Sequence, residues 1–330
     1  MNVGIHRRHL LGATAGLLGC STLPAWAQAG RYPSRPITFV VPFAPGGAVD
    51  ISGRAMADRL TKVLGQPIVV ENRAGAAGAI GTTYVAKAPP DGYTLVVTSQ
   101  STHVVNPAVS PNLSYHAESD FAPITLIDRL ANVLLVNASL PVKTFDEFVA
   151  FARAHPNKWN YASSGPGSVA HISMELIKAR LGLAVEHVPY KGAGPALTDL
   201  LSGTVQMTWN NLTSNLTNIV NGKLRALAVA APQRIPQLPS VPTFDELKLP
   251  ELNLTSWTGL AAPAGTPPAI VSRLYEAMRT VLTDPATKTA WEARGAILPQ
   301  AITPAQYKQE ISERIEFFRS TIKKHKIVLE

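Results

Sequence analysis

The chain has very little cysteine and no long apolar segment. Its 330 residues contain one cysteine, Cys20, so residues beyond position 29 cannot form an internal disulfide bond. No uninterrupted apolar stretch reaches the roughly 20 residues that a membrane-spanning helix needs. A chain of this length buries the cores of two ordinary domains without disulfides or metal ions. We therefore expect a soluble two-domain fold that is held together by hydrophobic burial.

Recognisable enzyme motifs are also missing. Residues 30–330 contain no nucleophile elbow, no zinc-type histidine pair, no phosphate-loop lysine motif and no cysteine nucleophile. The glycine-rich stretch 75–81 follows a predicted strand, but its spacing differs from that of a dinucleotide fingerprint. We expect no catalytic residue, no metal ion and no cofactor. One enzymatic alternative stays open, a secreted serine hydrolase in which Ser164, His171 and Asp199 form a triad.

Acidic residues are outnumbered by basic ones. The sequence has 30 Lys and Arg against 22 Asp and Glu, a net charge of +8 with neutral histidines. Residues 1–29 contribute two of the basic residues and none of the acidic ones, which leaves 28 against 22, or +6, for the rest. This charge favours the approach of anions, although ordinary surface charge explains it equally well. The basic residues are scattered and do not alternate with stacking aromatics, so we expect no nucleic-acid partner.

Residues 1–29 have the pattern of an export signal. Arg7 and Arg8 precede a mostly apolar stretch, residues 10–18, and small residues follow it. We therefore expect the protein in the periplasm after removal of residues 1–29. The two arginines leave twin-arginine export open beside the general secretory route. Two further alternatives are cleavage after Ala27 instead of Ala29, and lipid attachment at Cys20.

One local pattern is present twice in the chain. An apolar strand at residues 37–41 leads into a Gly/Pro loop and a helix, and a second strand at 159–162 leads into the loop 163–168 and another helix. Because each loop precedes a helix start, its unpaired amides and the positive end of the helix dipole form a small receptor for an anion. Two such receptors predict a clamp for a carboxylated small molecule.

Strands and helices alternate from Ile37 onward, which predicts mainly parallel sheets flanked by helices. The apolar stripe of the last helix, which starts at Pro304, predicts that the C-terminal helices pack against the first sheet. We expect two lobes joined by a hinge of two crossing segments, near 128–132 and 250–256, with ligands bound beyond the carboxyl ends of the strands. The predicted division is lobe one at residues 30–130 plus 256–330, and lobe two at residues 131–255.

The candidate ligand-binding residues lie at these strand ends. Glycines let a ligand oxygen approach main-chain amides, and serine, tyrosine and asparagine side chains offer neutral donors. We expect Asp50 to brace the first loop rather than contact an anion, and His103 and His171 to be hydrogen-bonded structural residues. Lys191 meets a second carboxylate or is an ordinary surface lysine. The predicted ligand-binding residues are Pro45, Gly46, Gly47, Ala48, Ser99, Ser163, Ser164, Gly165, Gly167, Tyr190 and Asn210.

A series of short motifs follows along nearly the whole chain from Tyr32. It includes Val41-Pro42-Phe43-Ala44-Pro45-Gly46-Gly47, Asn72-Arg73-Ala74-Gly75, Pro90-Asp91-Gly92-Tyr93, Val188-Pro189-Tyr190-Lys191-Gly192 and Ala262-Pro263-Ala264-Gly265-Thr266-Pro267. In this order the motifs resemble the periplasmic solute-binding receptors of tripartite tricarboxylate transporters, the Bug family. Many matches in sequence make the resemblance specific, whereas any one of them alone is not.

The resemblance implies a type II-like periplasmic binding protein fold that closes about its hinge and holds a ligand carboxylate through backbone amides and bridging waters. It also implies the integral-membrane permease subunits of a tripartite transporter as partners, and we expect a monomer. Val49 stands where such receptors often have Thr, and Asn210 where an acidic residue is common, which favours a ligand without a positive amine. A sensing role beside a membrane signalling kinase is the alternative. The sequence leaves open whether the ligand is a dicarboxylate, a tricarboxylate, an acidic amino acid, an aromatic acid or a nicotinate-like compound.

Overall fold

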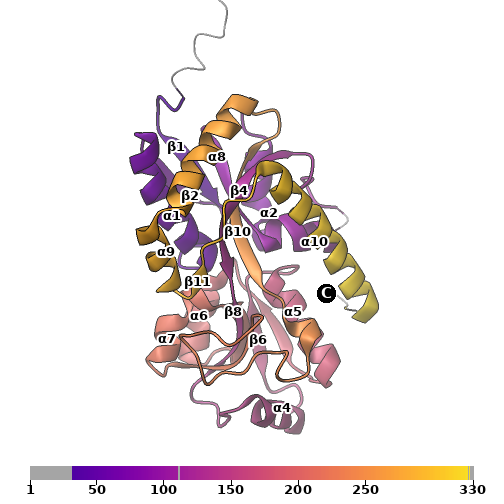
Figure 1. Ribbon diagram of the computed structural model, residues 1–330. Coiled ribbons are helices and arrows are strands. Elements are labelled where there is room, and N and C mark those ends of the chain that lie inside the picture. Colours follow the sequence, from indigo (N-terminus) through magenta and orange to yellow (C-terminus); the bar gives the residue numbers. More distant parts are fainter. Residues whose placement is uncertain (1–31, 111, 326, 328–330) are drawn as a thin grey trace, which may run out of the picture. The chain divides into compact units, whose positions relative to one another are not determined.

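Two β-sheets organise the chain in the computed structural model (Figure 1). The structure describes residues 32–110, 112–325 and 327, so the predicted export signal, its cleavage sites and Cys20 lie outside the described residues. Residues 33–330 form one compact unit. Within that unit each sheet is covered by its own helices, which gives the two lobes that are seen above and below one another in Figure 1.

Six strands form the sheet of lobe one. They are β1 (Ile37–Val41), β2 (Ile68–Asn72), β3 (Thr94–Ser99), β4 (Phe121–Leu130), β10 (Ser256–Pro263) and β11 (Ala296–Ile297). Their order across the sheet is β11-β4-β10-β3-β1-β2. β1 pairs in parallel with β2 and β3, whereas β10 runs antiparallel to β3 and β4, and β11 antiparallel to β4.

Eight helical segments belong to the same lobe. Among them, α1 lies against β1 and β2, and α8 and α10 lie against β4. The helices are α1 (Ala48–Leu64), α2 (Ala79–Ala86), α3 (Asn106–Val109), α8 (Pro268–Leu282), α9 (Pro285–Glu292) and α10 (Pro304–His325), with a 3-10 turn η2 (Ala76–Gly78) and a π-helical turn η3 (Ser101–Val105).

Lobe two is built on five strands in the order β7-β6-β8-β5-β9. β6 is parallel to β7 and β8, and β5 is antiparallel to β8 and β9. The strands are β5 (Asn132–Asn137), β6 (Asn160–Ser163), β7 (Glu186–Pro189), β8 (Met207–Asn211) and β9 (Leu224–Ala230). The helices are α4 (Phe145–Ala154), α5 (Val169–Leu181), α6 (Ala193–Ser202) and α7 (Leu216–Val220), with short 3-10 turns η4 (Leu212–Ser214) and η5 (Pro250–Leu252).

Both sheets are mixed, which corrects the prediction of mainly parallel sheets. The reason lies in the crossings between the lobes. β4 leads through Ala131 directly into β5, and the chain returns to the first sheet in β10. A strand that leaves a lobe and a strand that returns to it run in opposite directions, so β4 and β10 pair antiparallel. The predicted hinge of two crossing segments corresponds to these two connections.

The elements follow the local sequence signals closely. α1 buries Met56, Leu60 and Leu64 on one face and ends at Gly65, which has the left-handed φ of +70° that favours glycine. α4 begins at a capping box, where the Thr144 hydroxyl accepts from the Glu147 amide.

The C-terminal helix covers the first sheet as predicted. The stripe of α10 formed by Tyr307, Ile311, Ile315 and Phe318 is buried in a cluster that also contains β4 and lobe-two residues. The C-terminal helix therefore adds to the hydrophobic contact between the lobes.

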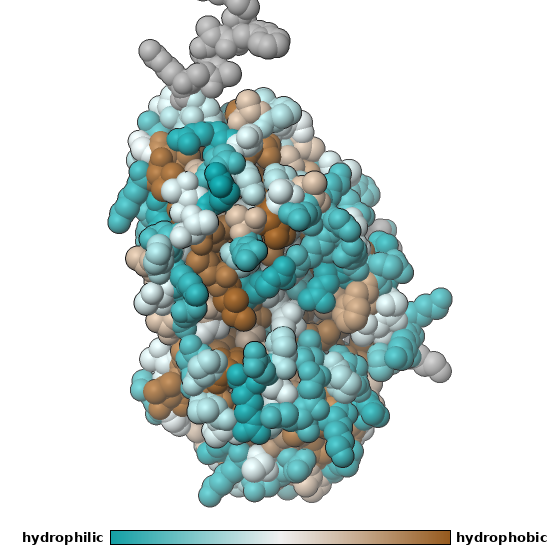
Figure 2. Space-filling view, viewed as in Figure 1, coloured by the Kyte–Doolittle hydropathy of each residue, from teal (hydrophilic) through white to brown (hydrophobic). Residues whose placement is uncertain are grey.

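The described surface offers no single large apolar face. In Figure 2 the brown areas are interrupted by teal on the side in view. The exposed large hydrophobic residues come from five different elements: Val69 in β2, Ile80 and Tyr84 in α2, Val220 in α7, Ile297 in β11 and Phe317 in α10. None of the helices in the described part of the chain is long and apolar enough to cross a membrane.

Candidate functional site

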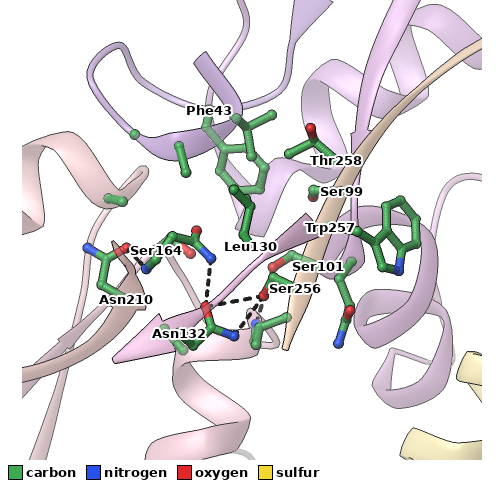
Figure 3. A pocket seen from close by; sticks show the side chains of 18 of the residues that line it. Phe43, Ser99, Ser101, Leu130, Asn132, Ser164, Asn210, Ser256, Trp257 and Thr258 are labelled. Carbon is green, nitrogen blue, oxygen red and sulfur yellow. Dashed lines mark hydrogen bonds between the residues drawn. The ribbon is translucent and has the colours of Figure 1, made fainter. Parts of the chain in front are cut away.

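A cavity lies between the two lobes, at the ends of the strands that face the hinge (Figure 3). Its volume is about 60 Å³. Since a buried water needs about 10–15 Å³ by this measure, the closed cavity has room for about four to six water-sized groups. The lining residues are Phe43, Gly47, Ala48, Val49, Ser99, Gln100, Ser101, Leu130, Asn132, Ser164, Val169, Ala170, Ala193, Trp209, Asn210, Asn211, Ser256, Trp257 and Thr258.

Three helices begin at this cavity. The first residues of α1 (Ala48 and Val49), of α5 (Val169 and Ala170) and of α6 (Ala193) all line it. The first turn of a helix has amides without helical acceptors, and each helix dipole places roughly half a positive charge at its N-terminus. The lining residues include no charged side chain. The positive potential of the cavity therefore comes from the main chain.

Neutral side chains complete the wall. Ser164 and Asn210 from lobe two and Ser99 and Ser101 from lobe one bring hydroxyl and amide groups to the cavity (Figure 3). The side chain of Gln100 is 1% exposed, and neither of its amide atoms has a hydrogen-bond partner in the protein. Because a buried amide without partners is unfavourable, Gln100 has hydrogen-bonding capacity available for water or a bound molecule.

Asn132 joins the two crossing segments at the floor of the cavity. Its Nδ2 donates to the carbonyl oxygen of Leu254 at 2.5 Å and to the hydroxyl of Ser256 at 2.9 Å. Its Oδ1 accepts from Nδ2 of Asn211 at 2.6 Å, as the dashed lines in Figure 3 show. One side chain thus ties β5 to the returning strand and to β8. These bonds connect the cavity wall directly to the hinge.

The lobes also touch each other at the mouth of the cavity. The Ala44 amide donates to the carbonyl oxygen of Lys191 at 3.2 Å, and the Val169 amide donates to the hydroxyl of Ser101 at 3.2 Å. A Cβ atom on Gly194 would lie only 2.1 Å from the carbonyl oxygen of Pro45. Main chain therefore meets main chain there, which only glycine permits. The structure represents a closed arrangement of the lobes.

Asp50 braces the first loop, residues 42–47, as predicted. Its carboxylate accepts from the amide of Gly46 at 3.1 Å, from Nδ2 of Asn72 at 2.8 Å and from Nε of Arg54 at 3.0 Å. Burial alone raises the pKa of Asp50, but the hydrogen bonds from Arg54, Asn72 and Gly46 outweigh it and hold the pKa below its ordinary value. The carboxylate is therefore ionised and committed to the loop, and it does not line the cavity.

A second buried carboxylate supports the lobe-one side of the cavity wall. Asp128 in β4 accepts from the hydroxyls of Ser52 in α1 and Thr258 in β10, each at 2.5 Å. Burial raises the pKa of Asp128 to about 6, against the lowering effect of these two hydroxyls and of Arg294. Thr258 lines the cavity, so Asp128 fixes the orientation of a cavity residue from behind.

The predicted site residues divide into two groups. Gly47, Ala48, Ser99, Ser164 and Asn210 line the cavity together. The others do not line it. Pro45 and Gly46 face Gly194 of the other lobe, Gly165 faces Ala77 of η2, and Gly167 faces Asn106. Ser163 is buried and bonded to His187. The Tyr190 hydroxyl donates to Asp199.

The residues of the apolar wall and of the hinge side of the cavity were not among those predicted from the sequence. Phe43, Leu130, Trp209 and Trp257 read as ordinary core residues because a large apolar side chain gives no sign of which cavity it borders. Asn132 and Ser256 had a weak signal: they are polar residues inside strands, at the two predicted crossings. A buried polar residue in a strand needs partners, so these positions were identifiable in principle.

The histidines have structural hydrogen bonds, as predicted. His103 is fully buried with its Nδ1 3.0 Å from the hydroxyl of Thr102, and burial lowers its pKa to about 3. His171 Nδ1 accepts from the amide of Gly167 at 3.1 Å.

The hydrolase triad is not assembled in the described residues. No hydrogen bond links Ser164, His171 and Asp199 there, since His171 is bonded to the second loop and Asp199 to Tyr190. Within the same residues no group of three or more His, Cys, Asp or Glu side chains is placed to hold a metal ion.

Comparison with known proteins agrees with this architecture. The model of a family described as "Tripartite tricarboxylate transporter family receptor" matches residues 53–327. BugT of Bordetella pertussis (strain Tohama I) is 38% identical over 312 residues, which cover 94% of this chain and 94% of that protein.

Solved structures resemble the chain over most of its length. MatC (Rpa3494) from Rhodopseudomonas palustris, with bound malate, has a TM-score of 0.85 and 36% identity and covers 88% of this chain and 100% of that one. Rpa4515 of R. palustris, with adipate, has a TM-score of 0.86 and 35% identity, and the match covers 90% of this chain and 99% of that one. The predicted two-lobed fold of periplasmic binding proteins is thereby confirmed. The chain belongs to the receptor family of tripartite tricarboxylate transporters and is a Bug-type solute-binding protein.

Proposed function

We propose that this protein is an extracytoplasmic receptor that captures a small carboxylate in the cavity between its lobes and delivers it to the membrane permease of a tripartite transporter. The observation that carries the proposal is the convergence of three helix N-termini on a cavity without charged side chains. Such a cavity offers first-turn amides and positive dipole ends to an anion. A cation would be repelled by the dipole ends, and a neutral ligand would form hydrogen bonds there without the added strength of charge assistance.

The ligand-binding residues that we propose are those predicted from the sequence that line the cavity, together with Ser101, Asn132 and Gln100. The remaining predicted residues, Pro45, Gly46, Ser163, Gly165, Gly167 and Tyr190, are proposed to shape the two loops around the ligand. Val49 and Asn210 both border the cavity and are uncharged. The proposed ligand therefore has no ammonium group, since no carboxylate lines the cavity to receive one.

Support for a carboxylate also comes from relatives. MatC and Rpa4515 were solved with malate and adipate, and both are more than a third identical to this chain. Charge-assisted hydrogen bonds contribute roughly 1.5–3 kcal/mol each, so three or four of them support micromolar binding after ordering costs. The family's place in a transport system supports a periplasmic location and a permease partner.

The direct test is a thermal-shift screen of the purified protein. The panel pairs malate, adipate, citrate and nicotinate with their uncharged amides at pH 7.5, and it adds aspartate as a carboxylate that carries an ammonium group. Binding at one hundred times the dissociation constant stabilises the protein by about 2.7 kcal/mol, which raises the melting temperature by several degrees. We expect at least one carboxylate to do so and its amide to have no effect. Stabilisation by amides but by no carboxylate would contradict the proposal.

Two rival roles are separated by further measurements. Pull-down of the ligand-loaded protein from membranes distinguishes a permease partner from a signalling kinase. Hydrolysis of ester substrates that is lost in Ser164→Ala would favour an enzyme instead.

A further inference from the structure

Three aromatic rings are stacked behind the second loop, residues 163–168. Tyr161 in β6 and His187 in β7 are register partners on neighbouring parallel strands, and their ring centroids are 4.8 Å apart with planes at 15°. His171 in α5 lies over His187 with centroids 4.1 Å apart and planes at 11°. The stack therefore combines two strands and the helix that follows the second loop.

Both histidines hold the second loop through hydrogen bonds. The amide of Gly167 donates to Nδ1 of His171 at 3.1 Å, and the hydroxyl of Ser163 lies 2.7 Å from Nε2 of His187. The Ser163 hydroxyl also accepts from the amide of Gly165 at 3.1 Å. The two rings thus brace the beginning and the end of one short loop.

The bond from Gly167 specifies the protonation state of His171. Because an amide can only donate, Nδ1 of His171 must carry a lone pair, so its proton is on Nε2 and the ring is neutral. A second proton on His171 would remove the acceptor of the Gly167 amide. Two charged rings stacked at 4.1 Å would also repel each other.

The charged groups around the stack act in opposite directions, since Glu175 favours protonation of the histidines and Lys178 opposes it. Glu175 and Lys178 face it from α5, Glu186 faces it from β7, and the Tyr161 phenol faces it from β6. The Glu175 carboxylate already accepts from Lys178 Nζ at 2.7 Å and from the Tyr161 hydroxyl at 2.5 Å.

Burial sets the direction of both histidine pKa values. It lowers the pKa of His187 to about 4, assisted by His171, and it lowers the pKa of His171 as well, against the attraction of Glu175. Near pH 7 both rings are therefore neutral.

The braced loop is the one that meets the cavity from lobe two. Ser164 lines the cavity, and so do Val169 and Ala170 in the first turn of α5. Gly165, between them, packs against Ala77 of lobe one, where a Cβ atom would lie 3.0 Å from the Ala77 amide. A shift of the loop would therefore move cavity donors and an interlobe contact together.

We propose that His171 and His187 are positioning residues for ligand binding, whose neutral rings hold the second loop so that Ser164 and the start of α5 face the cavity. Acid releases the loop, because the Gly167 amide loses its acceptor when His171 is protonated. The inference rests on the proposed carboxylate binding. According to this inference, the two histidine side chains contribute to the affinity for the carboxylate although they do not line the cavity.

The variants separate bracing from titration. His171→Asn retains an acceptor near the position of Nδ1 but cannot be protonated, and His187→Gln does the same near Nε2. His171→Leu removes the acceptor. The matched control is His155→Asn, because His155 Nδ1 bonds to the Phe151 carbonyl at the end of α4 and its ring packs on Phe151 and Trp159 instead of on the second loop.

The first measurement needs no carboxylate. Hydrogen exchange of the Gly165 and Gly167 amides, followed by NMR between pH 4 and pH 8, reports whether the loop is braced. After correction for intrinsic exchange, we expect protection to fall in acid for the wild type and the His155→Asn control. It stays constant in the His171→Asn/His187→Gln double variant, and in His171→Leu it is low at every pH. Equal protection in all of these proteins would overturn the proposal.

The second measurement is calorimetry with malate and adipate as probes over the same pH range. Titration of the probes themselves is common to all proteins, so the ratio of wild-type to double-variant affinity isolates the histidines. We expect this ratio to fall in acid, because protonation of His171 removes the acceptor of the Gly167 amide. His171→Leu is expected to weaken binding about tenfold at pH 7, the equivalent of about 1.4 kcal/mol.

The outcomes distinguish the two proposals. A constant affinity ratio across the pH range, together with tight binding by His171→Leu of unchanged melting temperature, would refute the positioning role while carboxylate binding stands. If His171→Leu does not fold, the double variant still decides through its pH profile. Failure of every carboxylate in the panel would refute the proposed function and the positioning role with it, whatever the exchange data show about the loop.

Discussion

The close approach of Gly194 to Pro45 gives the sharpest test of closure. Gly194 is the second residue of α6 in lobe two, whereas Pro45 belongs to the first loop in lobe one. In Gly194→Ala the new methyl group would lie 2.1 Å from the Pro45 carbonyl oxygen, when an ordinary contact needs at least 3.4 Å. The clash is relieved when the lobes separate. The substitution therefore opposes the closed state without disturbing the core of either lobe.

The size of the effect follows from that overlap. Inserting a methyl group where there is no room costs about 1–3 kcal/mol, and each 1.4 kcal/mol is a tenfold change in an equilibrium constant. If ligand binds tightly only to the closed state, the apparent affinity falls by the same factor as the closed population, about 5- to 150-fold. Alanine is also a better helix former than glycine, so the free energy of unfolding should remain equal or increase.

Calorimetry with the best carboxylate of the screen measures the affinity, and urea unfolding measures the stability. Gly203→Ala is the matched control, because Gly203 ends the same helix with a φ of +82° and has no contact with lobe one within 4 Å. It should lower the free energy of unfolding by about 1 kcal/mol, since alanine is strained there, and leave affinity unchanged. An affinity of Gly194→Ala within twofold of the wild type would refute the reasoning that these main chains must touch for binding.

Three further substitutions test the supports of the cavity. Asp50→Asn should lower the free energy of unfolding by about 1–3 kcal/mol at pH 7 in urea titrations. Because the folded pKa of Asp50 is lowered, this deficit should disappear as the pH falls through that pKa, and a deficit independent of pH would contradict the bracing role. Asn132→Ala should lower the free energy of unfolding by about 2–4 kcal/mol in the same assay, since it leaves the Leu254 carbonyl and the Asn211 amide without their partner. An unchanged free energy of unfolding would show that the hinge bonds are dispensable. Asp128 has a raised folded pKa, so its contribution to stability is present in acid and is lost as the pH rises through about 6. Relative to Asp128→Asn, the free energy of unfolding of the wild type should therefore fall by about 2 kcal/mol between pH 4.5 and 7. The opposite trend would exclude a raised pKa.

The order of strands and helices was predictable because its signals are local. The strand at 37–41, the helix that ends at Gly65 and the capping box at Thr144 and Glu147 all depend on residues within one or two turns of each other. The two-residue β11 was not indicated by the sequence, and neither was the longer β4. Its residues Phe121–Leu130 include Pro123 and Asp128, which are unusual inside a strand and gave no alternation.

Strand direction depends on contacts between distant segments, and so the mixed character of the sheets was not predictable. No residue pattern near Ser256 predicts that β10 inserts between β3 and β4 and runs antiparallel to β3. The boundaries of the two lobes stay a proposal for the same reason: they are chosen at the crossings, where β4 and β5 are separated by one residue.

The candidate site was predictable where it depends on main chain and not where it depends on packing. Glycine and proline beside a helix start identify a loop with unpaired amides, which gave Gly47, Ala48 and Ser164. The contribution of Trp209, Trp257 and Leu130 depends on which face of a strand borders the cavity after folding. His171 was assigned a structural bond from its position, but its stacking on His187 joins residues 16 apart and had no local signal.

The source of the cavity's positive potential has an evolutionary consequence. A receptor that pairs its ligand with an arginine can lose its preference for anions by one substitution, whereas the preference that we propose here belongs to peptide dipoles that every residue type retains. The neutral lining side chains can therefore change freely in size and polarity while the sign of the accepted charge is preserved. Gene duplication of such a scaffold would yield receptors for many different acids with little cost to the fold.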